Sequence, residues 1–234
     1  PFDLVGVNFL ETMNMPIYKI ASFEINDIPL IRYVAKKHKP MIISTGVADL
    51  DDIQLALDTC YKEGNYDISL LKCTSEYPAT YEQANLLTIP DMIHRFGIPV
   101  GVSDHTMGSL VPIVAVSLGA TIVEKHFILS RTNGGPDSAF SMEPNEFREM
   151  VDSIRNVERA LGNVKYDITD YQRGKRRSLY ARTDIHCGDV FTDQNVGSYR
   201  PGVGLSPQYW DQIMGKTCKR EIVKGDVLRQ EDLK

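Results

Sequence analysis

The chain has 234 residues, of which 42% are hydrophobic and 24% are charged, the balance of a globular protein with one large or two modest domains. Its net charge of −5 argues against a nucleic-acid-binding protein. No apolar run reaches the length of a membrane span, and the first residues lack the basic segment of a signal peptide. The four cysteines form no CxxC pair, so we expect free thiols and a cytoplasmic protein.

Residues 1–162 alternate between strand and helix patterns. A first helix over residues 4–13 is capped by Asp3, and Pro90 is expected to break the helical pattern in which it lies. Strict alternation predicts a parallel sheet that is covered on both faces. The expected strands are 17–22, 41–46, 68–75, 101–106 and 122–127, and the helices after them are 26–37, 50–62, 84–96, 107–120 and 144–161.

All five expected strands end in polar residues. Active sites of (β/α)8 TIM barrels gather at the carboxyl ends of the strands, so this pattern favours a barrel over an open doubly wound sheet. No glycine-rich phosphate motif opens a helix, which also disfavours a dinucleotide-binding fold. A barrel takes about 250 residues, so we expect that its first three βα units are missing from this chain. The strand-end residues are Lys19 and Ser22, Ser44, Ser75 with Tyr77, Ser103 with His105, and Glu124 with His126.

Two histidines stand at the ends of neighbouring strands. Residues 101–106 and 122–127 flank a single helix, so the two strands are expected to be parallel neighbours. His105 and His126 then lie at the same end of the sheet, with Glu124 one layer below. Such a group suits Mn, Fe or Zn with water or substrate completing the shell. The alternative interpretation is two unrelated polar residues at strand ends.

The pattern changes after residue 162. Residues 163–176 are polar and basic and are interpreted as a linker, and residues 177–234 as a β-rich domain. Residues 184–190 recur as 221–227, an offset of 37 that superposes two Gly-Asp turns. Between the copies, a stiff loop carries Arg200 forward. Nothing in this domain suggests chemistry of its own, so a lid or oligomerisation module is expected.

Together the motifs resemble those of the sialic acid synthase family. The resemblance covers essentially the whole chain and implies a (β/α)8 barrel followed by a small antifreeze-like (SAF, β-clip) domain, with residues 1–162 forming the partial barrel. The matching stretches are 1–3, 18–24, 43–46, 72–75 with 77–78, 103–106, 124–127, 135–137 and 200–202.

The resemblance implies a reaction between phosphoenolpyruvate and an N-acylated amino-sugar aldehyde in a bacterium or archaeon. It implies that His105 and His126 hold a divalent metal, Mn or Mg, which acts as a Lewis acid, and that Glu124 orients a ligand or water. It also implies a domain-swapped homodimer in which Arg200 reaches the N-acyl group in the partner subunit. Further substrate-binding residues by resemblance are Lys19, Ser22, Ser44, Ser75, Tyr77, Ser103 and Asp137.

Three of these residues have plainer interpretations. Lys19 could form a structural ion pair with Glu24, Asp137 could be a turn residue after two glycines, and Tyr77 could serve packing alone.

Ser75 and Phe23 differ from the asparagine and glycine usual in the family. At both positions the chain resembles the branch of the family whose acceptor is 2,4-diacetamido-2,4,6-trideoxy-altrose. Ser75 is shorter than asparagine and Phe23 is apolar, and both properties suit a C6 methyl group in the acceptor. N-acetylneuraminate- and legionaminate-forming members are the alternative. A metal hydrolase and a non-catalytic sugar-binding or scaffold protein are the alternatives from other classes. A family glutamate and lysine of the first two strands are expected to be absent, which puts the activity of this chain alone in question.

Overall fold

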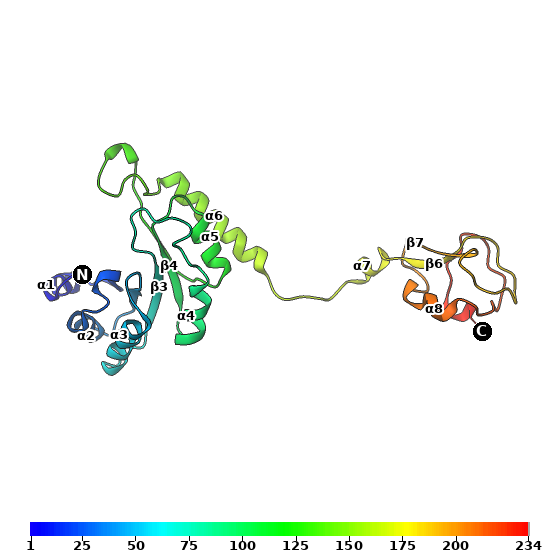
Figure 1. Cartoon of the computed structure of the whole chain (residues 1–234), viewed down its shortest axis with the longest axis horizontal. Coiled ribbons are helices and arrows are strands. Elements are labelled where there is room, and N and C mark those ends of the chain that lie inside the picture. Colours follow the sequence, from blue (N-terminus) through cyan, green and yellow to red (C-terminus); the bar gives the residue numbers. More distant parts are fainter. Residues whose placement is uncertain (234) are drawn as a thin grey trace. The chain divides into compact units, whose positions relative to one another are not determined.

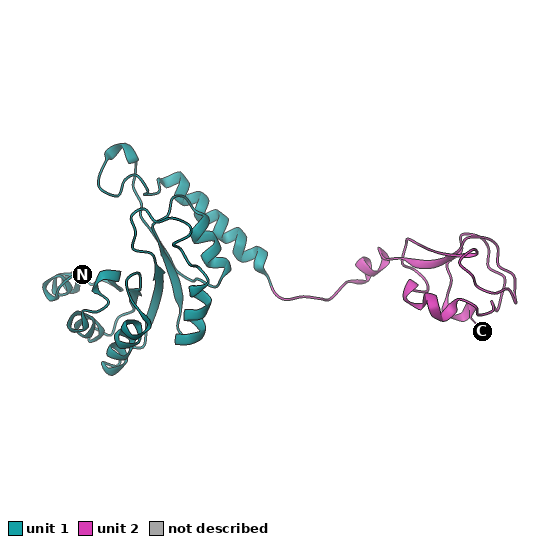
Figure 2. Ribbon diagram, viewed as in Figure 1, with its two compact units in different colours: residues 1–162 teal, residues 163–234 magenta. Residues whose placement is uncertain are grey.

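The chain folds into two compact units, Pro1–Gly162 and Asn163–Lys234, in a computed structural model that describes residues 1–233 (Figure 2). Among these described residues, no helix is long and apolar enough to cross a membrane. The two units are named unit 1 and unit 2.

Unit 1 is a parallel sheet whose five strands are paired in chain order, with helices between them (Figure 1). This confirms the predicted α/β architecture. The strands are β1 (Tyr18–Ile20), β2 (Met41–Ser44), β3 (Ile68–Cys73), β4 (Val100–Asp104) and β5 (Val123–Lys125). The helices are α1 (Leu4–Thr12), α2 (Ile28–Ala35), α3 (Leu50–Lys62), α4 (Thr88–Phe96), α5 (Leu110–Ser117) and α6 (Pro144–Leu161), with short 3-10 turns η1 (Ser22–Glu24) and η2 (Arg131–Asn133).

Local sequence signals explain where most of these helices begin. The Asp3 carboxylate accepts a hydrogen bond from the Gly6 N–H at 2.6 Å and caps α1. Asp49 and Asp52 form a reciprocal capping box at the start of α3. The predicted break at Pro90 is wrong. Pro90 lies in the first turn of α4, where a missing backbone N–H removes no helical hydrogen bond.

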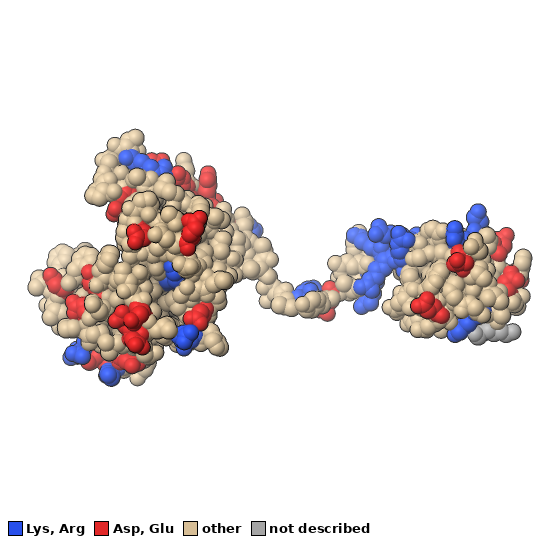
Figure 3. Space-filling view, in the orientation of Figure 1, with Lys and Arg blue, Asp and Glu red and all other residues tan. Residues whose placement is uncertain are grey.

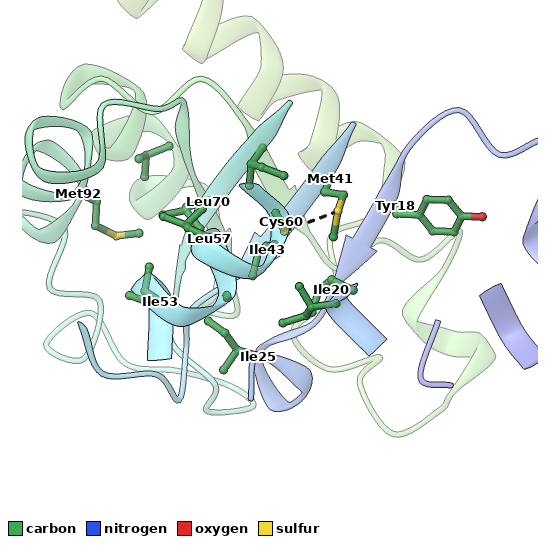
Figure 4. Packing of buried hydrophobic residues seen from close by; sticks show 14 of the residues in the cluster. Tyr18, Ile20, Ile25, Met41, Ile43, Ile53, Leu57, Cys60, Leu70 and Met92 are labelled. Carbon is green, nitrogen blue, oxygen red and sulfur yellow. Dashed lines mark hydrogen bonds between the residues drawn. The ribbon is translucent and has the colours of Figure 1, made fainter. Parts of the chain in front are cut away.

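The main core lies between the sheet and the helices α2 to α5. Alternate strand residues such as Tyr18, Ile20, Met41 and Ile43 face this layer and are at most 1% exposed. Figure 4 shows them packed with residues of α3, including Cys60, whose Sγ lies 4.0 Å from Met41 Sδ. Each fully buried aliphatic side chain contributes about 1.5–3 kcal/mol, so this layer fixes the register of every strand.

The sheet is strongly curled. β1 and β5 are its two edge strands, and four strand spacings of about 4.8 Å would separate them by roughly 19 Å in a flat sheet. Nevertheless, Lys19 Nζ on β1 lies 3.6 Å from Glu124 Oε1 on β5. The side chains of the two edges meet across the concave face, which is the curvature of a TIM-type barrel.

Unit 2 is small and built on its internal repeat. β6 (Ser178–Ala181) and β7 (Val196–Tyr199) are antiparallel, and helical turns lie at α7 (Asp170–Gly174), η3 (Pro207–Tyr209), α8 (Trp210–Ile213) and η4 (Gln230–Asp232). α7 lies within the segment that was interpreted as a linker.

The two copies of the repeat pair with each other. Ile185 and Ile222, which are equivalent by the offset of 37, exchange backbone hydrogen bonds of 2.8 and 2.9 Å. Gly188 and Gly225 sit at equivalent turns with φ of 94° and 93°, where glycine is favoured. The repeat therefore forms an approximate two-fold arrangement.

Candidate active site

Polar side chains gather on the concave face of unit 1, where the strands end. In the parallel registers, Cys73 lies beside Ser103 and Ser103 lies beside Glu124. Since side chains alternate along a strand, these three share the concave face, whereas Val100 and Val102 belong to the core on the other face. We call the polar set on the concave face the inner cluster. It consists of Lys19, Ser22, Ser44, Cys73, Ser75, Ser103, His105, Glu124 and His126.

The two histidines lie side by side, as predicted. β4 ends at Asp104 and β5 at Lys125, so each histidine is the first residue after its strand rather than part of it. The ring centroids of His105 and His126 are 5.2 Å apart. His105 Nδ1 lies 2.7 Å from the Thr74 carbonyl oxygen. A carbonyl can only accept, so Nδ1 carries the proton and Nε2 is left to act as a ligand.

Glu124 links the two edges of the site. Its Oε1 accepts a hydrogen bond from Ser103 Oγ at 2.7 Å and lies 3.6 Å from Lys19 Nζ. The structural alternative for Lys19 was a pair with Glu24, but its partner is Glu124. The Glu124 side chain is 43% exposed, so its second oxygen can reach a bound molecule.

A group of small polar side chains surrounds Gly46. The Gly46 N–H donates to Ser22 Oγ at 3.0 Å, and Cys73 Sγ lies 3.7 Å from Ser75 Oγ. A Cβ added at Gly46 would lie 2.9 Å from Ser22 Oγ and 3.0 Å from Cys73 Sγ and would collide with Ser75 Oγ. Only glycine lets the backbone approach these groups so closely.

Two buried side-chain oxygens in this region have no hydrogen-bond partner among the described residues. They are Ser44 Oγ and Glu24 Oε2, each at or just after the carboxyl end of a strand. An unsatisfied buried polar atom costs about 1–3 kcal/mol, and a bound ligand would relieve that cost. Glu24 was not predicted as a site residue, although it lies two residues after Ser22, within the stretch 18–24 that resembles the family.

Aromatic rings enclose the histidines. The Tyr77 ring lies 4.1 Å from the His105 ring and 5.9 Å from the His126 ring, so Tyr77 belongs to the site. The ring centroids of Phe140 and His126 are 5.0 Å apart, and Phe140 was not predicted because it lies beyond the matching stretch 135–137. Asp137 Oδ2 is 3.6 Å from His126 Nδ1, which brings this loop residue to the site as well.

Burial and hydrogen bonding shift the pKa values of the titratable groups here. Burial raises the pKa of Cys73, but hydrogen bonds with His105, Ser22, Ser103 and Ser75 outweigh it and bring the value to about 7. Burial lowers the pKa of His105, but its hydrogen bonds with Cys73 and the Thr74 carbonyl leave the value raised. Burial and the neighbouring His105 lower the pKa of His126, which favours the neutral ring that a metal needs.

The separation of the two histidine rings is compatible with a shared divalent metal ion. A metal bound at about 2.1 Å lies roughly 3.2 Å from the centroid of each ligating ring, so two such centroids are at most about 6.5 Å apart. The observed 5.2 Å meets this limit. Among the described residues, no set of three or more His, Cys, Asp or Glu could hold a metal alone, so water or substrate oxygens would supply the other ligands.

Comparison with known proteins identifies the family. A sequence profile of the NeuB family matches residues 1–166, and a profile of the SAF domain matches residues 176–234. The chain belongs to the NeuB family. This confirms the predicted resemblance, and it confirms the barrel-type fold with a carboxy-terminal SAF domain.

The NeuB relatives are longer than this chain. Pseudaminic acid synthase of Helicobacter pylori is 42% identical over 100% of this chain and 70% of its own length. N,N'-diacetyllegionaminic acid synthase of Campylobacter jejuni is 36% identical over 98% and 71%. The crystal structure of N-acetylneuraminic acid synthetase from Leptospira borgpetersenii matches with a TM-score of 0.70 and 34% identity, over 74% of this chain and 60% of that one.

Of the predicted site residues, only Arg200 lies in unit 2. There it lines a cavity of about 400 Å³ with Tyr180, Arg182, Tyr199 and Lys224. Arg200 forms no ion pair with any carboxylate in the part of the chain that the structure describes. Its guanidinium is therefore available to an external ligand.

Proposed function

We propose that this protein is a pseudaminic acid synthase, which condenses phosphoenolpyruvate with 2,4-diacetamido-2,4,6-trideoxy-altrose. The observation that carries the proposal is the pair His105 and His126, 5.2 Å apart, beside a glutamate held by Ser103 and Lys19. The 42% identity with the Helicobacter pylori synthase favours this acceptor over those of the legionaminate and neuraminate synthases.

In this reaction, C3 of phosphoenolpyruvate bonds to the aldehyde carbon, water adds at C2 and phosphate leaves, giving a nine-carbon 2-keto acid. Mn or Mg bound by His105 and His126 would supply a Lewis acid for the aldehyde oxygen. The protein contributes the positions of the two substrates and a group that accepts the proton of the water.

Lys19 and the serines of the inner cluster suit the anionic substrate. An ammonium and several hydroxyl donors around one concavity match a phosphate and a carboxylate. Ser44 Oγ, buried and without a partner, would gain a hydrogen bond on binding. Glu124 is oriented by Ser103 and is accessible, so it can accept the proton of the attacking water.

The acceptor sugar would lie between the aromatic rings and the loop that carries Asp137. Tyr77 would wall the pocket, Ser75 would leave room beside it, and Asp137 would accept hydrogen bonds from sugar hydroxyls. Phe140 adds an apolar surface that suits a C6 methyl group in place of a hydroxymethyl group.

We further infer a domain-swapped homodimer in which unit 2 covers the site of the partner. Residues 1–162 carry 13 Lys and Arg against 21 Asp and Glu, a net charge of −8, whereas residues 163–234 carry 13 against 10, a net charge of +3. Figure 3 shows Lys and Arg atoms gathered on unit 2 near α7 and β6. Opposite net charges favour this association, and Arg200 would then reach the N-acyl group. All four cysteines are free thiols, which supports a cytoplasmic location.

The test offers the protein phosphoenolpyruvate and Mn²⁺ with a panel of N-acyl sugars and measures phosphate release. We expect release with 2,4-diacetamido-2,4,6-trideoxy-altrose and little with N-acetylmannosamine or 2,4-diacetamido-2,4,6-trideoxy-mannose. Preferred use of either mannose derivative would replace the acceptor assignment. Tight phosphoenolpyruvate binding without release for any sugar would favour the non-catalytic alternative.

A further inference from the structure

The outer face of the same strand ends carries an unbalanced set of buried charges. Lys125 Nζ lies 2.6 Å from Asp104 Oδ2, and their side chains are 1% and 2% exposed. The Thr106 N–H also donates to Asp104 Oδ1 at 2.9 Å. Lys72, 8% exposed, is a second buried lysine on this face, which therefore holds two lysines and one carboxylate, and that carboxylate is paired with Lys125.

Lys72 has little to compensate its charge. Among the described residues no carboxylate forms an ion pair with it, and its hydrogen-bond acceptor is Thr74 Oγ1 at 2.8 Å. Burial is the largest influence on this group and lowers its pKa. An uncompensated buried ammonium is costly, so an anion that reaches Lys72 would bind favourably.

A cavity gives access to this lysine from the helix side of the sheet. It has a volume of about 520 Å³ and lies between the ends of β2 and β3 and the first turns of α3 and α4, within the range of about 300–1,000 Å³ typical of small-molecule sites. Leu50, Ile53 and Met92 supply apolar walls, and Asp49 and Asp91 also line it. Because the two aspartates are exposed and Lys72 is buried, the lysine lies at the inner end and the carboxylates lie at the mouth.

We propose that this cavity binds a small monocarboxylate, whose carboxylate accepts hydrogen bonds from Lys72 and whose apolar body lies against Leu50, Ile53 and Met92. The site faces away from the inner cluster and does not depend on the proposed condensation. Lys72 and Cys73 are adjacent residues of β3 that both line the cavity, so the two sites meet at Cys73, which also belongs to the inner cluster.

The two aspartates at the mouth select the charge of the ligand. A monocarboxylate places its only charge at the inner end, next to Lys72. A phosphate dianion or a dicarboxylate carries additional negative charge toward the mouth, where Asp49, which has no ion-pair partner among the described residues, repels it; Asp91 contributes less because it is paired with Arg95. The cavity therefore favours one carboxylate with a short hydrocarbon chain over inorganic phosphate.

The test measures the melting temperature of the 234-residue protein with sodium butyrate against sodium chloride at equal ionic strength. We expect Tm to rise by about 3–5 °C at a butyrate concentration ten times Kd, and to rise less with phosphate. Lys72→Met should lose the butyrate response. Lys62→Met, which removes an exposed lysine of α3, should keep it, and so should Lys19→Met, which removes the ammonium of the inner cluster.

A second variant keeps the test decisive if Lys72→Met folds poorly. Asp49→Asn preserves the cap of α3, since asparagine caps as well as aspartate, but removes one negative charge from the mouth. It should raise the phosphate affinity several-fold relative to butyrate. The proposal is overturned if butyrate gives no rise in Tm, if Lys72→Met responds like the wild-type protein, or if Asp49→Asn leaves the phosphate-to-butyrate ratio unchanged.

Discussion

The two faces of strands β3 to β5 carry polar residues at adjacent positions but use them differently. Cys73, Ser103 and Glu124 project to the concave face, while their neighbours Lys72, Asp104 and Lys125 project outward. On the outer face the ion pair of Asp104 and Lys125 is dry, with side chains 1% and 2% exposed. On the inner face the pair of Lys19 and Glu124 is 30% and 43% exposed.

This difference separates stability from function. A buried ion pair is strongly destabilising when one partner is lost, whereas an accessible pair contributes little to folding and remains available to a ligand. Substitutions in the inner cluster are accordingly expected to change the free energy of unfolding little but to impair substrate binding or turnover. Substitutions in the pair of Asp104 and Lys125 are expected to lower the free energy of unfolding without removing a group that contacts the substrates.

The largest effect is expected at the metal ligands of the inner face. His105→Ala or His126→Ala should lower kcat/KM for condensation by about 10³-fold or more, because losing a Lewis acid removes several kcal/mol of transition-state stabilisation. Both variants should also retain less Mn²⁺ after gel filtration. His94→Ala, an exposed histidine in the last turn of α4, is the matched control. Normal turnover by either site variant in the presence of a chelator would contradict the metal role.

The outer face should give the largest effect on folding. Asp104→Asn leaves Lys125 buried without a counter-charge, so the free energy of unfolding in urea should fall by about 3–5 kcal/mol. Asp91→Asn breaks the exposed pair with Arg95 and should cost less than about 1 kcal/mol. Equal decreases in the free energy of unfolding of these two variants would show that burial does not determine how much each ion pair contributes to stability.

Lys19→Met tests the inner pair in the same way. We expect its free energy of unfolding to change by less than about 1 kcal/mol, while KM for phosphoenolpyruvate rises by about 10²-fold, since a charge-assisted hydrogen bond to the substrate contributes about 1.5–3 kcal/mol. The measurements are urea denaturation and steady-state kinetics. A large loss of stability with unchanged KM would mean that Lys19 is structural.

A smaller effect is expected from Gly46→Ala. The added Cβ collides with Ser75 Oγ and lies 2.9 Å from Ser22 Oγ, so the hydroxyl groups must shift and KM for phosphoenolpyruvate should rise by roughly 10-fold. Gly174→Ala is the control, because a Cβ there meets nothing within 4 Å. Wild-type kinetics in both variants would show that the absence of a side chain at Gly46 is not needed to position these hydroxyl groups.

The sequence by itself determined the order of the elements and the face of each strand residue. Alternation along a strand and the parallel connection through one helix are local rules, so the sequence is sufficient to place His105, His126 and Glu124 together. The recurrence of residues 184–190 at 221–227 revealed the repeat of unit 2, although not that its two copies pair with each other.

Only the tertiary structure decided which residues from distant strands touch. Lys19 meets Glu124 because the sheet curls, and the degree of curl depends on packing across the whole core. The positions of Phe140 and Glu24 depend on loops that carry no periodic signal. The number of buried charges on the outer face, two lysines for one aspartate, follows from side-chain burial, which is a property of the folded molecule rather than of any short stretch of sequence.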